Sequence, residues 1–232
     1  FVACFAGCVL LFQWQVRDTW VLDVSDGKDG FVYFSDAGEV VWIDTGGKPA
    51  AWPVHDRCGT GVRAYVLTTL DADASWRLLL RTEGLRVGTI YAPAARTAAE
   101  EREMEVISGL AKAKNCAIIF YEEALDLQAA SSRLRFWRQN AETWRIDLTA
   151  RGRKMLLFAG APGLGGATYD TIVALAGARG PVEALGYRLL LCSRAARVSV
   201  PDGRPGTMEY MYQGRAAVEY RAGAGREIVY EP

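Results

Sequence analysis

The chain has 232 residues, of which 50% are hydrophobic and 23% are charged, and its 27 Lys and Arg residues balance its 27 Asp and Glu residues. This composition excludes an intrinsically disordered chain and a strongly basic surface that coats nucleic acid. The length suits one large α/β domain, because domains of this class often exceed about 200 residues without splitting.

The first twelve residues, FVACFAGCVLLF, form an unbroken apolar segment. A helix needs about 20 such residues to cross a bilayer, so this segment is too short to span one by itself. We expect residues 1–13 to be the end of a truncated transmembrane helix and residues 14–232 to form the globular domain. Trp14 and Trp20 suit an interfacial anchor. A signal-peptide core and a buried first strand or helix are the alternatives.

The next segments predict a β-sheet with acidic loops at its edge. Residues 20–24 and 31–34 are β-favouring runs that flank a cluster of turn residues, which predicts a hairpin. Residues 40–43 and 64–67 are buried-strand runs, and each is followed by an acidic loop that contains Asp44 or Asp71 and Asp73. Loops at the carboxyl ends of strands usually line the functional crevice of an α/β fold.

Further along the chain, Thr97 and Glu100 form a capping box that predicts a helix from Thr97. Strands are predicted over residues 116–121, 144–149 and 155–158, and a second helix is predicted over about residues 169–178 after a glycine-rich turn. That turn lacks a phosphate-binding motif, so a plain connection is expected. A strand over 187–192 and a terminal hairpin around Gly223 complete the prediction.

Histidine and cysteine are scarce. Cys4 and Cys8 lie in the apolar N-terminal segment and the other three cysteines occur singly, so neither a disulfide framework nor a CxxC zinc knuckle is predicted. The chain has one histidine, His55, although imidazole is the commonest neutral ligand for zinc. We expect His55 to be a hydrogen-bonding residue of a surface loop.

In their order and spacing, these segments resemble the metallo-β-lactamase-like domain that ends the ComEC family of competence DNA-uptake membrane proteins. The resemblance covers about residues 20–232. The segments that carry it are Leu22-Asp23-Val24, Ile43-Asp44-Thr45-Gly46, the run from Leu67 to Ala74, Ile90-Tyr91-Ala92-Pro93, the run from Leu156 to Ala161 and the run from Gln213 to Val218. The resemblance implies an α/β chain with a four-layer αββα sandwich, preceded by the end of a transmembrane helix.

The family's fold holds two zinc or other divalent ions, and this chain departs from the pattern at the ligand positions. Thr69 and Ala74 stand where the resemblance places histidines, Ala161 stands where it places a metal-bridging aspartate, and the downstream His-His-Gly-Ser motif has no counterpart. A ligand must approach zinc within about 2.0–2.2 Å, which these side chains cannot do as donors. We therefore predict no cofactor and no catalytic residue.

Asp71, Asp73 and Asp44 remain as vestigial metal-ligand candidates. The alternative role that we favour for Asp71 and Asp73 is to accept backbone N–H groups of the turn toward Trp76. For Asp44 and Asp23 we expect a structural role, in which each carboxylate ties together the backbone of neighbouring loops.

The resemblance implies a non-catalytic domain of a membrane protein involved in DNA uptake, located outside the cytoplasm at the bacterial cell membrane. Its expected partners are the membrane, single-stranded DNA and the channel part of the same protein.

A basic strip interleaved with aromatic residues is the candidate DNA-binding surface. The alternative is that these residues lie on the solvated outer faces of strands. The strip is predicted to contain Arg133, Arg135, Trp137, Arg138 and Arg145, with Phe136, Trp144, Arg151, Arg153 and Lys154 nearby. A nuclease-like hydrolase with a rebuilt metal site and a structural partner-binding domain are the other hypotheses.

Overall fold

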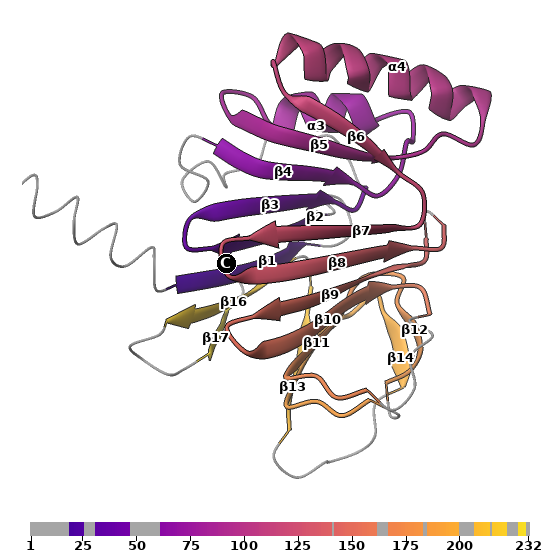
Figure 1. The fold of residues 1–232 in the computed structure, drawn as a ribbon. Coiled ribbons are helices and arrows are strands. Elements are labelled where there is room, and N and C mark those ends of the chain that lie inside the picture. Colours follow the sequence, from indigo (N-terminus) through magenta and orange to yellow (C-terminus); the bar gives the residue numbers. More distant parts are fainter. Residues whose placement is uncertain are drawn as a thin grey trace, which may run out of the picture.

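The computed structural model describes residues 19–25, 31–46, 61–140, 142–161, 167–182, 185–199, 207–213, 215–221 and 227–230. Within these ranges the chain forms two large β-sheets that pack face to face, and two helices lie on the outside of one of them (Figure 1). The apolar segment Phe1–Phe12 lies outside the described residues. Within the described part of the chain, neither helix combines the length and the apolar character needed to cross a membrane.

The first sheet has eight strands. In spatial order they are β17 (Glu227–Tyr230), β16 (Arg215–Arg221), β1 (Thr19–Ser25), β2 (Phe31–Asp36), β3 (Glu39–Asp44), β4 (Gly61–Leu67), β5 (Arg86–Pro93) and β6 (Ala117–Tyr121). The hairpin predicted from residues 20–34 and the strands predicted over 40–43 and 64–67 are confirmed. Strands β3 to β6 run parallel to one another, so their carboxyl ends meet at one edge of the sheet.

Two helices, α3 (Ala74–Arg81) and α4 (Ala98–Ala113), cover the outer face of this sheet (Figure 1). The helix predicted from Thr97 is confirmed, because the Thr97 hydroxyl accepts the N–H of Glu100 at 3.2 Å as an N-cap. A buried apolar cluster joins the helices to the sheet and contains Trp42, Leu78 and Ile107. This cluster fixes α3 beside the carboxyl ends of β3 and β4.

The second sheet has seven strands. In spatial order they are β15 (Met208–Tyr212), β13 (Leu189–Ser193), β11 (Thr171–Ala174), β10 (Arg153–Ala159), β9 (Trp144–Ala150), β8 (Ser132–Arg138) and β7 (Ala124–Ala129). Its inner face packs on the first sheet through a large apolar cluster that includes Phe34, Val66, Phe136, Trp144 and Leu157. The alternating burial predicted for residues 144–149 is confirmed in β9.

The helix predicted over residues 169–178 is wrong, because this segment contains strand β11. Residues 171–174, Thr-Ile-Val-Ala, are all buried and pair in parallel with β10 on one side and β13 on the other. A short parallel strand with two buried faces lacks the alternation that would distinguish it from a helix in the sequence.

Over β10, β11 and β13, the outer face of the second sheet is covered by the two-stranded pair β12 (Arg179–Pro181) and β14 (Arg197–Ser199) and by the segments beside it. Leu156, Phe158 and Leu190 of the sheet pack there against Val182 and Leu185. Within the described ranges both helices lie on the first sheet, so the second helical layer of the expected αββα sandwich is not seen there.

The buried carboxylate of Asp36 ties two turns of the second sheet to the first sheet. One of its oxygens accepts hydrogen bonds from the hydroxyls of Ser131 and Ser132 at 2.8 and 2.7 Å, and from the Ser131 N–H at 3.2 Å. The other oxygen forms an ion pair with Arg151 at 3.2 Å. Asp36 thus connects the β2–β3 hairpin to the β7–β8 and β9–β10 turns.

Candidate functional site

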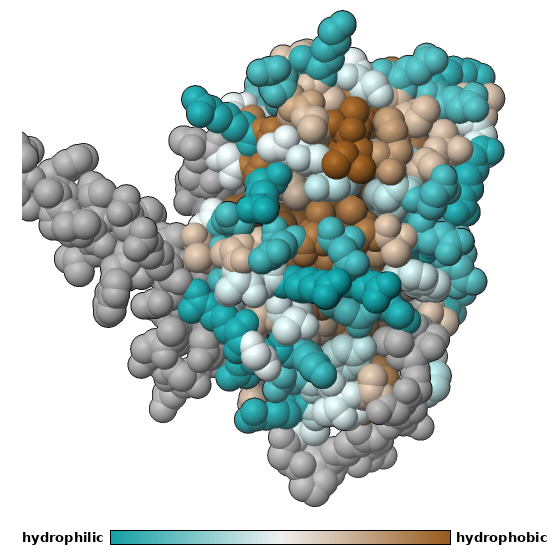
Figure 2. Space-filling model, viewed as in Figure 1, coloured by the Kyte–Doolittle hydropathy of each residue, from teal (hydrophilic) through white to brown (hydrophobic). Residues whose placement is uncertain are grey.

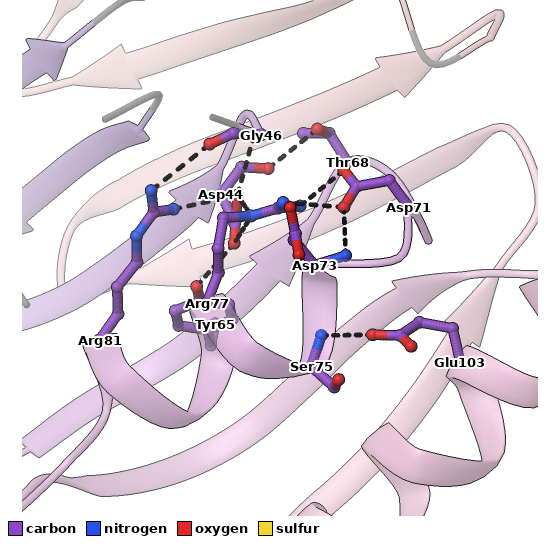
Figure 3. A network of polar contacts seen from close by, with 10 residues as sticks. All are labelled: Asp44, Gly46, Tyr65, Thr68, Asp71, Asp73, Ser75, Arg77, Arg81 and Glu103. Carbon is purple, nitrogen blue, oxygen red and sulfur yellow. Dashed lines mark hydrogen bonds and ion pairs between the residues drawn. The ribbon is translucent and has the colours of Figure 1, made fainter. Parts of the chain in front are cut away.

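The two acidic loops predicted from the sequence lie together at the carboxyl edge of the parallel strands. Asp44 is the last residue of β3, and Asp71 and Asp73 lie in the short connection between β4 and α3. Because β3 and β4 are parallel neighbours, the loops that follow them meet (Figure 3). The candidate site is therefore the group of polar side chains around Asp44, Asp71 and the buried face of α3.

Asp44 is fully buried and its oxygens are all used within the protein. One carboxylate oxygen accepts the N–H of Gly46 at 2.8 Å, and the other accepts the hydroxyl of Tyr65 at 2.9 Å. Its main-chain oxygen accepts the N–H and the hydroxyl of Thr68 at 3.1 and 2.9 Å. Asp44 thus has the structural role predicted for it. The side chain of Asp23 lies outside the described part of the structure.

The guanidinium of Arg77 bridges two carboxylates (Figure 3). Its Nε lies 3.1 Å from both carboxylate oxygens of Asp44, and its two terminal nitrogens donate to the two oxygens of Asp71 at 2.8 Å each. The Arg77 side chain is only 1% exposed. Burial by itself would lower the pKa of Arg77, but the hydrogen bonds and charges of Asp71 and Asp44 outweigh burial and raise it, so the group stays charged.

Arg81 completes the network one helical turn later. Its Nη1 lies 3.0 Å from an Asp44 oxygen, and its side chain is 2% exposed. Positions 74, 77, 78 and 81 form the buried face of α3, on which Ala74 and Leu78 alternate with the two arginines. Two cations and two carboxylates therefore meet in one charge-balanced cluster.

The cluster also affects Tyr65, whose ring is completely buried beside Asp44. Burial and the negative charge of Asp44 raise the pKa of Tyr65 well above its usual value. The phenol is therefore a hydrogen-bond donor at any physiological pH and cannot serve as a base.

The sequence analysis predicted neither a helix over Ala74–Arg81 nor a role for Arg77 and Arg81. A detectable pattern was present: the arginines recur at the same helical spacing as Ala74 and Leu78, which places all four on one face. Two acidic loops at the same sheet edge supply the negative charge that such buried cations require.

The predicted turn role of the loop aspartates is confirmed for Asp71 and is wrong for Asp73. Asp71 accepts the N–H of Asp73 at 2.9 Å, which is the expected side-chain-to-backbone bond. Asp73 is the N-cap residue of α3, yet its side chain makes no capping hydrogen bond. The two carboxylates thus differ: Asp71 is held in place and Asp73 extends toward solvent.

This donor set does not fit a two-metal centre. Both oxygens of Asp71 already accept from a guanidinium, and Asp44 lies in contact with two arginines. Thr69 and Ala74, at the positions of two expected histidines, bring no nitrogen donor. In the described ranges no group of three His, Cys, Asp or Glu side chains is placed to hold a metal ion. His55 lies outside the described residues.

The predicted basic strip is only partly brought together. Arg133, Arg135 and Trp137 of β8 share the outer face of the second sheet with Arg145 of β9, and hydrophilic side chains gather over these strands in Figure 2. The guanidinium of Arg145 lies 5.1 Å from the centre of the Trp137 ring. Two of the three arginines are paired with acids, since Arg133 contacts Asp126 at 3.4 Å and Arg145 contacts Asp147 at 3.3 Å.

Arg138 does not belong to that strip. It follows Trp137 directly, so strand alternation places it on the opposite face, with Ser132, Leu134 and Phe136 between the sheets. It is 4% exposed. Phe136 and Trp144 are likewise buried in the core, and Arg151 is paired with Asp36, so none of these side chains can contribute to an outer strip.

Comparison with known proteins bears on the fold. No family model and no curated protein sequence matches the chain. Among solved structures, the metallo-β-lactamase fold protein YhfI from Bacillus subtilis is similar, with a TM-score of 0.50 at 10% sequence identity over 92% of this chain and 99% of that chain. The chain has a metallo-β-lactamase-like fold. At this identity the likeness shows the fold alone, and the resemblance in architecture predicted from the sequence is confirmed to that extent.

Proposed function

We propose that the chain is a non-catalytic metallo-β-lactamase-like domain of a membrane protein related to the ComEC family, with a part in DNA uptake. The proposed absence of catalysis rests on the two ion pairs that Arg77 forms with Asp71 and Asp44. A guanidinium, which stays charged at all accessible pH values, supplies the positive charge that the fold's metal ions would otherwise supply to these carboxylates. The link to DNA uptake rests on the order and spacing of the motifs in the sequence.

The first test concerns chemistry. The purified protein is dialysed against zinc and, separately, manganese, and its metal content and nuclease activity on single-stranded DNA are measured. We expect less than one tenth of a metal ion per chain and no activity above that of the Asp71→Ala/Asp73→Ala double variant. Stoichiometric metal together with activity that this double variant loses would establish instead the hydrolase with a rebuilt site.

The outer face of β8 and β9 is the proposed contact for single-stranded DNA. Support comes from Arg135, which is exposed, and from the stacked pair of Arg145 and Trp137, which offers a cation beside an aromatic ring. The pairing of Arg133 and Arg145 with aspartates reduces the net positive charge of this face to about one unit among these groups. We therefore propose weak, salt-dependent binding.

Fluorescence anisotropy with a labelled oligonucleotide at 50 mM and 200 mM salt tests the DNA contact. Arg135→Ala and Trp137→Ala should each weaken binding several-fold, and binding should fall as salt rises, because phosphate contacts release counterions. Arg102→Ala, on the exposed face of α4, is the matched control and should bind like the unaltered protein. Binding that is insensitive to salt and to Arg135→Ala would remove this surface from the proposal and favour a domain that binds only protein partners.

The membrane assignment is proposed from the apolar residues 1–12 and from the family resemblance. Expression of the complete gene product followed by membrane fractionation tests it. We expect the protein in the membrane fraction with the domain of residues 14–232 accessible to protease from the outside. Recovery of the complete product in the soluble fraction would contradict this assignment.

A further inference from the structure

A buried arginine whose Nε lacks a hydrogen-bond partner among the described residues lies at the same end of the sandwich as the Asp44 network. Arg138 ends β8 and is 4% exposed. Its Nε is buried and has no hydrogen-bond partner in the described part of the structure. Its backbone N–H, by contrast, donates to the Glu123 carbonyl at 2.7 Å.

Tyr121 connects Arg138 to the candidate site. The Tyr121 hydroxyl donates to the carbonyl of Leu67 at 2.6 Å, next to Thr68, which bonds to Asp44. The Tyr121 ring packs edge-on against Phe136 with centroids 5.5 Å apart, and its phenol lies within electrostatic reach of Arg138. Figure 1 shows the ends of β3, β4, β6 and β8 on the same side of the molecule. Arg138 therefore lies at the end of the sandwich where β3 and β4 present their acidic loops.

The acids of this region do not neutralise Arg138. Asp44 and Asp71 are balanced by Arg77 and Arg81, and Glu122 and Glu123, in the β6–β7 connection, are exposed and form no ion pair with Arg138. The carboxylates of Asp44 and Asp71 and the three arginines therefore sum to one positive charge. An unpaired buried ion costs several kcal/mol, and arginine, unlike lysine, cannot escape this cost by losing its proton.

We infer that Arg138 is the anchor of an anion-binding site at this end of the sandwich, and that its ligand is a small oxyanion that presents two oxygens to the guanidinium fork. Phosphate and carboxylate groups both have this geometry. A bound oxyanion would neutralise the extra charge and give the Nε the acceptor that the described residues do not supply. The inference does not depend on the proposed DNA contact, which uses the opposite face of β8.

Thermal unfolding in matched buffers tests this inference. The protein is titrated with sodium phosphate and, in a second arm, with sodium acetate, against sodium chloride at equal ionic strength and pH. We expect a saturable rise in Tm with at least one of the two oxyanions, and the stronger arm identifies the ligand class. The absence of a saturable rise in both arms would overturn the inference.

Two variants of the same strand locate the site. Arg138→Met should abolish the response to the oxyanion, whereas Arg135→Met, which removes the same charge from the outer face of β8, should respond like the unaltered protein. In chloride alone, Arg138→Met should melt at or above the temperature of the unaltered protein, because an uncompensated buried charge has been replaced by an apolar side chain of similar length. A variant that is destabilised or unfolded in chloride, or that keeps the oxyanion response, would contradict the assignment of Arg138.

Discussion

Arg77 donates both terminal nitrogens of its guanidinium to the two carboxylate oxygens of Asp71, at 2.8 Å each. Asp71 belongs to the loop in which the metallo-β-lactamase-like fold is expected to carry metal ligands, and here that loop is held by an arginine of the following helix. The same guanidinium reaches Asp44 through its Nε. A protein-borne cation thus stabilises the loop and β3 together.

Removing Arg77 should strongly destabilise the fold. In Arg77→Met, Asp44 keeps only Arg81 as a counterion and Asp71 loses both of its charge-assisted hydrogen bonds. We expect a loss of about 3–5 kcal/mol in the free energy of unfolding, the usual cost of breaking a buried ion pair from one side. Urea denaturation measures it.

The matched control for that experiment is Arg63→Met. Arg63 forms an ion pair with Glu39 at 2.6 Å, but both side chains are exposed, by 51% and 39%. Exposed pairs contribute about 0–1 kcal/mol, so this variant should be nearly as stable as the unaltered protein. Equal losses in the two variants would show that burial of Arg77 does not govern its contribution.

Asp36→Ala should loosen the attachment between the two sheets. This change removes the acceptor of Ser131, Ser132 and Arg151 in one step and leaves the buried Ser132 hydroxyl unsatisfied. A destabilisation of about 3–5 kcal/mol is expected on the same grounds as for Arg77. Hydrogen exchange should increase first in the β7–β8 and β9–β10 turns. Asp126→Ala, which breaks only the exposed pair with Arg133, is the control, and a similar loss there would refute the assigned role.

Alkaline pH should reduce stability through Tyr169. Burial, followed by the hydrogen bond and charge of Asp147, raises the pKa of Tyr169 to about 12. An unfolded tyrosine releases its proton near pH 10, so this contribution is fully present below about pH 10 and is lost as the pH rises toward 12. Tyr169→Phe should therefore show a smaller drop in urea midpoint between pH 9 and pH 11.5, measured by fluorescence.

The control for the alkaline experiment is Tyr210→Phe. Tyr210 is 46% exposed on the edge strand β15, so its removal should leave the pH dependence of the midpoint unchanged. If the urea midpoints of Tyr169→Phe and of the unaltered protein fall in parallel as the pH rises, then burial and Asp147 do not raise the pKa of Tyr169 in the folded protein.

Gly160→Ala should be destabilising, because Gly160 has a positive φ of +71° at the end of β10 and a Cβ there would meet the Thr143 hydroxyl at 2.5 Å and the Thr143 Cα at 2.9 Å. The expected loss in the free energy of unfolding is about 1–3 kcal/mol.

Gly109→Ala is the opposite case, because Gly109 lies inside α4 with open space around the position of a Cβ. We expect a gain of about 0.5–1 kcal/mol in the free energy of unfolding. Chemical denaturation of both variants checks the two signs.

Local patterns in the sequence determined much of the fold. The capping box of Thr97 and Glu100 set the start of α4, the turn residues after β1 indicated the first hairpin, and apolar runs located β3, β4, β6 and β10. The inward position of Arg138 was also encoded there, because Leu134 and Phe136 mark the buried face of β8 and Arg138 has the same parity. Grouping Arg138 with Arg133 and Arg135 by charge overlooked that period of two. These features depend on neighbours within a few residues, which is why sequence alone sufficed.

Only the tertiary structure decided the partners of the buried charges and the conformation of residues 171–174. Arg77 and Arg81 become buried because β3, 33 to 37 residues earlier in the chain, brings Asp44 to the same sheet edge as α3. The helical spacing of the two arginines places them on one face, but it does not identify their partner. Residues 171–174 become a strand because β10 and β13 supply hydrogen bonds on both sides. In both cases contacts between distant segments outweighed local preference, since a buried charge or a buried backbone group is stable only where its partner is supplied.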